Sequence, residues 1–175
     1  SNTDATTARQ FLHDQSGVLW VVSNERVQHV SEDRTLNHSK IFNIQTNANE
    51  LALYKNEIVI GTYGAGLHSF ANYSKLFPKD INLNLPKQAQ RTMDLLAVGD
   101  NLYIASFDGI WVFNDQEKTI KKLDIDSNNK ILLHLKHKDN LLYVGTNDHG
   151  YFTYDLDSKT VIEIIDEHDG LSKNE

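Results

Sequence analysis

The chain repeats one strand–turn–strand unit four times, and this repeat constrains its fold more than any other feature. The clearest copy spans residues 61–67, where a small residue, a hydroxyl and a tight turn separate two apolar runs. The four copies align on Trp20, Val59, Tyr103 and Tyr143, at spacings of 39, 44 and 40 residues. The chain is therefore built from similar short units.

An all-strand repeat of about 40 residues is the period of a β-propeller blade, a small sheet of four antiparallel strands. The second strand of each unit is almost wholly apolar, as expected for a strand that neighbouring sheets cover on both faces. We therefore predict an all-β fold over residues 1–175, a β-propeller of about four blades. The blades are expected at approximately residues 10–45, 50–78, 92–125 and 130–166, within one domain that is part of a larger propeller.

Composition excludes several function classes. The net charge of −7 disfavours the phosphate backbone of a nucleic acid as a partner. The absence of cysteine removes disulfides, thiol catalysis and thiolate metal sites. We predict that the chain holds no cofactor and no metal.

Two groups of residues resemble catalytic or metal sites, and both have a simpler interpretation. His13, Asp14 and Ser16 supply the residue types of a hydrolase triad, but adjacency in sequence does not give triad geometry. His134 and His137 are three apart, so they point to opposite faces of a strand and do not share an ion. We predict that the chain has no catalytic residues.

The turns between the second and third strands form the best candidate site. In a propeller these turns lie on the same face as the connections between blades, where they converge around the axis. Such a mixture of aromatic and polar groups suits a small polar or saccharide-like ligand, although ordinary hairpin turns would explain the same residues. The candidate ligand-binding residues are Asn24, Glu25, Tyr63, Phe107, Asp108, Asn147, Asp148 and His149, with Arg91 adding a positive charge.

Three segments resemble the repeats of the two-component regulator propeller family. Residues 14–20 (DQSGVLW) resemble the segment D-x-x-G-x-L-W, and residues 60–67 (IGTYGAGL) resemble I-G-T-x-x-G-G-L. Residues 169–174 (DGLSKN) are similar to the linker D-G-L-P-S-N, with Ser172 where proline is usual. The first copy departs from the pattern, since Val22 and Arg26 replace small residues.

The resemblance implies a location and a function. Repeats of this family form periplasmic sensory propellers of membrane-bound histidine kinases or GGDEF-type diguanylate cyclases. The resemblance implies that this chain is an extracytoplasmic ligand-sensing module without catalysis of its own. It also implies a parent protein anchored in the bacterial inner membrane. The alternatives are a propeller enzyme of the lyase or lactonase type and a scaffold for protein interactions.

The repeat count also bears on assembly. Propellers have about 4–8 blades, so four is the low limit, and the DGLSKN segment introduces another repeat in the family. An open arc of four blades would expose apolar sheet faces, which drive association. We therefore expect self-association as a dimer or further blades in the parent chain; the alternative is a closed ring of four blades.

Overall fold

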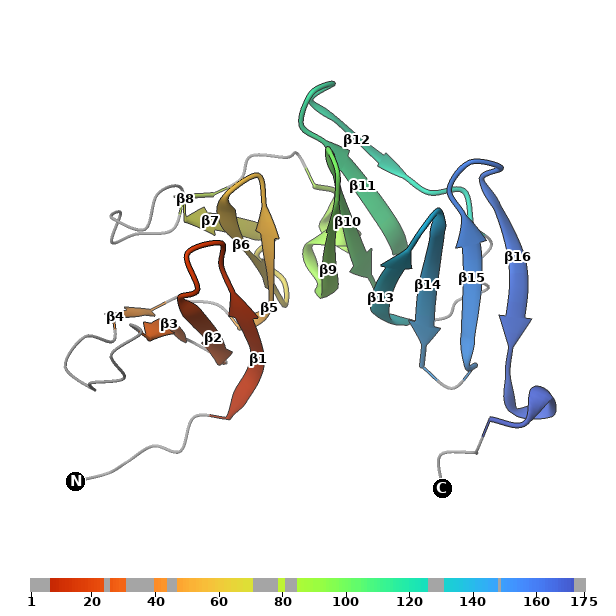
Figure 1. Cartoon of the computed structure of the whole chain (residues 1–175), viewed down its shortest axis with the longest axis horizontal. Coiled ribbons are helices and arrows are strands. Elements are labelled where there is room, and N and C mark those ends of the chain that lie inside the picture. The colour runs from red at the N-terminus through yellow and green to blue at the C-terminus, as the bar shows by residue number, and fades with distance from the viewer. Residues whose placement is uncertain are drawn as a thin grey trace. The chain divides into compact units, whose positions relative to one another are not determined.

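The computed structural model describes residues 7–23, 26–30, 40–43, 47–70, 79–80, 85–125, 131–147 and 149–171. Within them, strands β1 to β16 form four antiparallel sheets of four strands each (Figure 1). In every sheet the strands are neighbours in chain order, so each sheet is a meander of hairpins. This is the blade organisation that the sequence repeat predicts.

The four sheets follow one another along the chain. Sheet 1 contains β1 (Ala8–His13), β2 (Leu19–Ser23), β3 (Arg26–Val30) and β4 (Lys40–Asn43). Sheet 2 contains β5 (Ala48–Tyr54), β6 (Glu57–Thr62), β7 (Leu67–Phe70) and β8 (Lys79–Asp80). Sheet 3 contains β9 (Thr92–Val98), β10 (Asn101–Ser106), β11 (Gly109–Asn114) and β12 (Thr119–Lys122). Sheet 4 contains β13 (Leu132–Lys138), β14 (Leu141–Thr146), β15 (Tyr151–Asp155) and β16 (Thr160–Ile165), and short 3-10 helices span Lys87–Gln90 and Glu167–Asp169.

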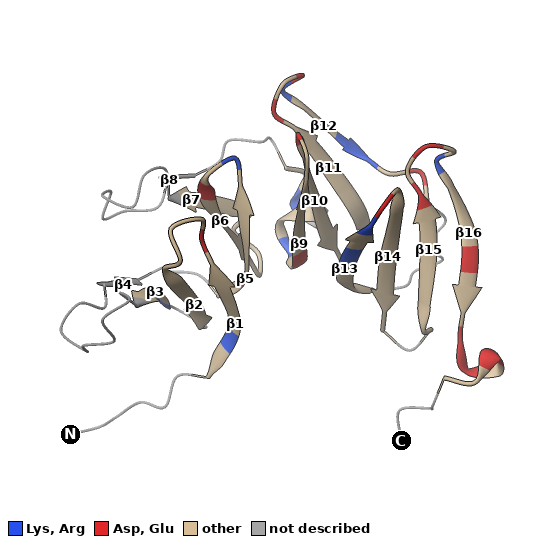
Figure 2. Cartoon of the chain, in the orientation of Figure 1, with Lys and Arg blue, Asp and Glu red and all other residues tan. Residues whose placement is uncertain are grey.

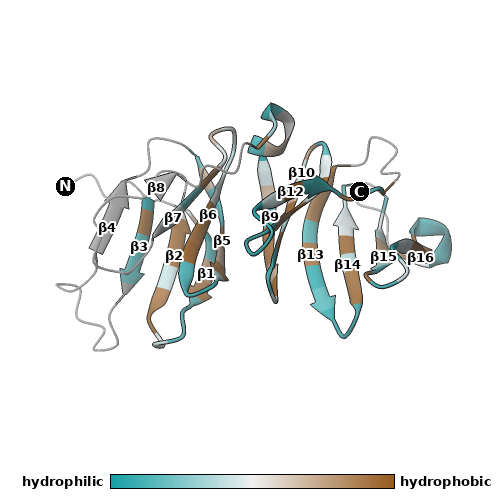
Figure 3. Ribbon diagram, turned by 90° about the horizontal axis from the view of Figure 1, so that it is seen from above, coloured by the Kyte–Doolittle hydropathy of each residue, from teal (hydrophilic) through white to brown (hydrophobic). Residues whose placement is uncertain are grey.

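The chain divides into two compact units. The first comprises residues 1–82 and 90–92, and the second comprises residues 83–89 and 93–175. In the first unit, sheets 1 and 2 share one core, in which Trp20 and Val22 of β2 pack with Leu51 of β5 and Ile58 and Ile60 of β6. This core explains why β2 and β6 are the most hydrophobic strands of the unit (brown in Figure 3).

The second unit has the same construction around its own core. Tyr103 and Ile110 of sheet 3 pack against Leu135, Val144 and Phe152 of sheet 4. Each core thus depends on two adjacent sheets, because a four-stranded sheet alone cannot bury both of its faces.

Asp14 organises the turn between β1 and β2. One carboxylate oxygen accepts hydrogen bonds from the Ser16 backbone N–H at 2.8 Å, the Ser16 hydroxyl at 2.7 Å and the Val18 N–H at 3.0 Å. The other oxygen accepts the indole N–H of the fully buried Trp20 at 2.8 Å. The role of Asp14 is therefore to hold a tight turn onto the core, and His13 and Ser16 do not form a catalytic arrangement with it.

The position of the small residue in each repeat accommodates larger side chains than the sequence pattern suggests. Val22 fills this position in sheet 1 and is fully buried in the core. A Cβ added to Gly145 in sheet 4 would meet the Cβ of His134 at 3.5 Å, which is an ordinary contact. Close approach of a neighbouring sheet does not demand glycine at residue 145.

Candidate functional site

A repeated hydroxyl holds the turns that carry the candidate residues. It belongs to the last residue of the second strand in each sheet. It donates a hydrogen bond to the carbonyl of the first residue of the third strand, or of the residue just before that strand. The four bonds join Ser23 to Arg26 (3.2 Å), Thr62 to Gly66 (2.7 Å), Ser106 to Gly109 (2.9 Å) and Thr146 to Gly150 (2.9 Å). Because each hydroxyl accompanies a tight turn, the chain presents four similar scaffolds with different turn residues.

Tyr63 and Arg91 lie together in the first unit. Their backbones form an isolated antiparallel bridge, and the guanidinium carbon of Arg91 lies 5.5 Å from the centre of the Tyr63 ring. Tyr63 is 44% exposed and Arg91 is also exposed. An aromatic face beside a guanidinium can stack on a flat or sugar-like group and offer it several hydrogen-bond donors.

The backbone around Tyr63 is held by carbonyl groups of two distant residues, Gln90 and Asn47. The Gln90 carbonyl accepts the N–H of Gly64 at 3.0 Å and of Gly66 at 3.3 Å, while the Tyr63 N–H donates to Asn47 at 2.8 Å. Gly64 has a φ of 121°, which side-chain-bearing residues rarely adopt. These backbone hydrogen bonds fix the shape of the turn that carries Tyr63.

Phe107 and Asp108 form the corresponding turn of sheet 3, and a lysine joins them. The ammonium of Lys122, at the end of β12, lies 3.1 Å from the Asp108 carboxylate. The same side chain passes over Gly109, where an added Cβ would meet Lys122 Cε at 2.8 Å. Lys122 therefore belongs to this candidate site, although the sequence pattern gave no reason to choose it.

Asn147 and His149 form the corresponding turn of sheet 4. The Asn147 N–H donates to Ile131 at 2.8 Å, and Nδ1 of His149 lies 3.1 Å from the Asn147 carbonyl. Both side chains are exposed. The other candidates, Asn24, Glu25 and Asp148, lie outside the described residues.

The structure therefore brings the candidate residues together as local groups. Tyr63 pairs with Arg91, Asp108 with Lys122, and Asn147 with His149. Tyr63, Asp108, Asn147 and His149 occupy equivalent turns of three sheets, whereas Arg91 precedes β9 and Lys122 ends β12. The convergence of all these turns on one ligand stays a prediction.

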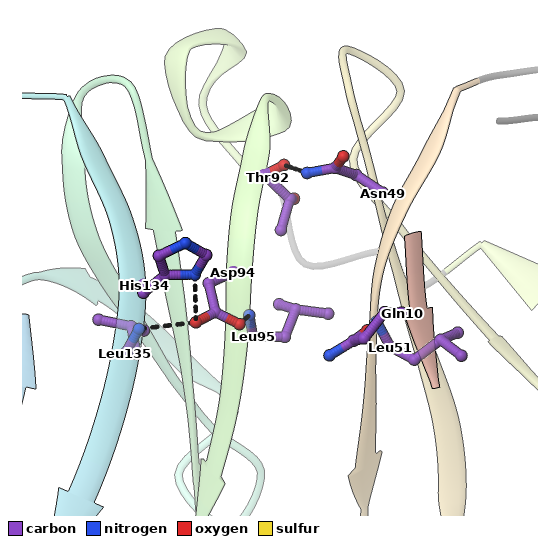
Figure 4. A network of polar contacts seen from close by, with 8 residues as sticks. All are labelled: Gln10, Asn49, Leu51, Thr92, Asp94, Leu95, His134 and Leu135. Atoms are coloured by element: carbon purple, nitrogen blue, oxygen red, sulfur yellow. Dashed lines mark hydrogen bonds and ion pairs between the residues drawn. The ribbon is translucent and has the colours of Figure 1, made fainter. Parts of the chain in front are cut away.

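Polar side chains on the first strands link adjacent sheets, a feature that the sequence alone did not suggest (Figure 4). The Gln10 side-chain oxygen in β1 accepts the Leu51 N–H of β5. The Asp94 carboxylate in β9 accepts the Leu135 N–H of β13 at 2.6 Å, and both pairs are 41 residues apart. One polar residue per link therefore fastens the first strand of one sheet to that of the next.

Asp94 has an unusual ionisation because of its place in this link. Burial raises its pKa above the ordinary value near 3.8, and hydrogen bonds from the Leu135 and Leu95 N–H groups only partly oppose that rise. Nδ1 of the exposed His134 side chain lies 4.0 Å from the same carboxylate. These contacts give Asp94 a structural role between β9 and β13.

The described residues contain no group of three or more histidine, aspartate or glutamate side chains that could hold a metal ion. His134 is exposed and lies beside Asp94, whereas His137 of the same strand is half-buried. Within the same part of the chain, no helix has the length and hydropathy that a membrane span requires.

Comparison with known proteins identifies the fold. No protein-family profile and no curated protein matches the chain. A solved structure of the computationally designed Ika4 protein aligns with a TM-score of 0.67 at 12% identity, over 89% of this chain and 94% of that protein.

Two further similar structures come from B. thetaiotaomicron. The extracellular domain of a proposed hybrid two-component system, BT3049, aligns with a TM-score of 0.70 at 17% identity, over 91% of this chain and 25% of that one. The extracellular domain of a proposed one-component system, BT4673, aligns with a TM-score of 0.61 at 15% identity, over 94% of this chain and 29% of that one. The chain thus spans about a quarter of the length of these two domains. The four repeated sheets and these similar structures together confirm the predicted β-propeller fold.

Proposed function

We propose that this chain is a ligand-sensing propeller module, located in the periplasm as part of an inner-membrane signal-transduction protein. The observation that supports this most directly is the Tyr63–Arg91 pair, an exposed aromatic ring beside a guanidinium on a turn held by the Gln90 carbonyl. The extracellular location of the domains of BT3049 and BT4673 supports the proposed compartment. In such a parent protein, the output domain would be a histidine kinase or a diguanylate cyclase.

The proposed ligand is small and polar, with saccharides as the first class to test. Stacking on Tyr63 would suit the apolar face of a sugar ring, and Arg91 would donate to its oxygens. The Asp108–Lys122 and Asn147–His149 pairs offer further donors and acceptors at the corresponding turns of sheets 3 and 4, with Lys122 reaching Asp108 from the end of β12. Such a site binds without chemistry, because none of these groups forms a nucleophile and base pair in the described residues.

A thermal-shift screen with saccharides and common metabolites tests this proposal. A ligand that binds only the folded state stabilises it by about 2.7 kcal/mol at a concentration of 100 times its Kd, which raises the melting temperature. Tyr63→Ala and Arg91→Ala should each reduce the shift caused by an identified ligand. Lys118→Ala is the matched control, because Lys118 is a highly exposed cation on a turn between third and fourth strands.

The outcomes separate the proposed sensor from its alternatives. A ligand shift that is unchanged in both Tyr63→Ala and Arg91→Ala would place the site elsewhere and contradict this assignment. A stoichiometric metal found by elemental analysis would favour a propeller enzyme. Capture of a macromolecule without any response to small ligands would favour an interaction scaffold.

A further inference from the structure

The segment of residues 166–171, which follows β16, folds back on itself in a defined shape. It contains the short 3-10 helix Glu167–Asp169, which Asp166 caps in a capping box and a left-handed glycine ends. The Asp166 carbonyl accepts the Leu171 N–H at 3.4 Å, so the segment closes onto its own start. Figure 2 shows this helix at the end of β16, with its acidic residues in red.

The same segment packs against the turn between β14 and β15. The Cδ1 atom of Leu171 lies 2.9 Å from the position that a Cβ would occupy at Gly150, and Cα of Asp166 lies 3.0 Å from it. Leu171 is 39% exposed, so most of its side chain is covered. Any side chain at residue 150 would overlap with the segment, so the backbone of the turn and the segment are in direct contact.

Gly150 is also the residue on which the shape of this turn depends. Its carbonyl accepts both the backbone N–H and the hydroxyl of Thr146, each at 2.9 Å. Asn147 and His149, two of the candidate ligand-binding residues, lie between Thr146 and Gly150. A displacement of Gly150 would therefore loosen the backbone that positions both candidate residues.

Sheet 2 has a similar arrangement. The 3-10 helix Lys87–Gln90 follows β8, and its last carbonyl accepts the N–H groups of Gly64 and Gly66. These glycines belong to the turn that carries Tyr63, between β6 and β7. In both sheets a 3-10 helix after the fourth strand thus leads to a contact with a glycine of the turn between the second and third strands. The recurrence indicates that this contact belongs to the repeat.

We propose that the segment of residues 166–171 is a latch on the candidate ligand-binding turn of sheet 4, so that docking of the latch and the shape of the turn are linked. A ligand that binds Asn147 and His149 in the docked state would hold the latch in place. Release of the latch would weaken that binding by the same factor, because linkage is reciprocal. The link to a ligand rests on the proposed function, whereas the contact between Leu171 and Gly150 does not.

Hydrogen exchange of individual amides, followed by NMR, tests the latch without a ligand. The reporters are hydrogen-bonded backbone N–H groups, at Thr146 and Asn147 on the turn and at Asp169 and Leu171 in the latch. Leu171→Ala removes the contact with the turn, so it should raise the exchange rates of the turn reporters about fivefold or more. The N–H groups of β10 should keep their rates, which separates a local opening from a general loss of stability.

Gly150→Ala tests the coupling from the other side, and it should raise the exchange rates of the latch reporters about fivefold or more. Ile162→Ala is the matched control for Leu171→Ala, because Ile162 is also an exposed apolar residue. It lies between residues that pair with Thr153 and Tyr154, away from the turn, and should change neither set of reporters. Circular dichroism checks that each variant folds, and Leu171→Ala decides alone if Gly150→Ala does not fold.

The outcomes keep the latch and the proposed function apart. Turn reporters that are unchanged in Leu171→Ala would overturn the latch and leave the proposed ligand site standing. An effect of Ile162→Ala as large as that of Leu171→Ala would also overturn it, because the contact with Gly150 would then have no special role. Coupled exchange in a chain that responds to no compound of the thermal-shift screen would support the latch and contradict the proposed function.

Discussion

The carboxylate of Asp14 accepts the indole N–H of Trp20 at 2.8 Å, and both side chains are buried. Trp20 is also the residue on which the first repeat aligns and a central member of the core of sheets 1 and 2. The hydrogen bond therefore ties a surface turn to the packing of two sheets. A carboxylate with four donors in such a place stabilises the fold far more than an exposed one.

Asp14→Ala should destabilise the chain strongly. The substitution leaves the buried indole N–H and the Val18 N–H without this acceptor, at an expected cost of about 3 kcal/mol in the free energy of unfolding. Asp14→Asn keeps one oxygen acceptor and should cost less than Asp14→Ala. Urea denaturation of the three proteins measures the order, and equal stability of Asp14→Ala and the unmodified chain would contradict the role assigned to this carboxylate.

Acid should weaken the same interaction. Burial acts to raise the pKa of Asp14, but hydrogen bonds from Ser16, Trp20 and Val18 outweigh it and leave the pKa below its ordinary value of 3.8. The stabilisation is then fully present at pH values above the pKa of Asp14 in the unfolded chain. It is lost as the pH falls through the lower pKa of Asp14 in the folded chain. Denaturation curves measured across this acid range should show a loss of stability that is smaller in Asp14→Ala.

Asp94 should have the opposite pH dependence. Burial raises its pKa above 3.8 in the folded chain, despite hydrogen bonds from Leu135 and Leu95. The folded state therefore holds the carboxyl proton of Asp94 more tightly than the unfolded state does. The contribution of Asp94 to stability then falls as the pH rises from its pKa in the unfolded chain through its higher pKa in the folded chain. The difference in unfolding free energy between the unmodified chain and Asp94→Asn isolates this effect. As the pH rises, the unfolding free energy of the unmodified chain should fall relative to that of Asp94→Asn. A difference that stays constant with pH would contradict the raised pKa of Asp94.

Two glycines of sheet 4 provide a matched pair of substitutions. A Cβ at Gly150 would lie 2.0 Å from the Ile165 carbonyl, and its φ of 65° is already unfavourable for alanine. Gly150→Ala should cost at least about 2 kcal/mol or displace the segment after β16.

The control is Gly145→Ala, which should change the stability by less than about 1 kcal/mol, because its Cβ meets His134 at 3.5 Å and the backbone is not strained. Thermal unfolding of both variants compares the two sites. Similar melting temperatures would show that the backbone after β16 yields easily at Gly150.

The repeat was readable in the sequence because its signals are local. Strand, hydroxyl, turn and glycine lie within a few residues of one another, and the hydroxyls of Thr62, Ser106 and Thr146 hydrogen-bond within their own turns. The apolar second strands and the spacing of Trp20 from its later counterparts were sufficient to predict four antiparallel sheets. Tyr63, Asp108 and His149 were likewise placed on turns from the local pattern.

The contacts between distant residues were decided by the tertiary structure. Lys122 reaches Asp108 only because β12 returns beside β11, and Gln10 and Asp94 meet Leu51 and Leu135 only after adjacent sheets have packed. The sequence does not predict the partner of a polar residue that lies 41 positions away, because the direction of the side chain depends on strand register and sheet packing. The same holds for β16. Val161 and Ile164 pair with core residues of β15 and share their face of the sheet, yet both side chains are exposed. Local hydrogen bonding and periodicity thus determined the strands and turns, and long-range packing determined which side chains meet.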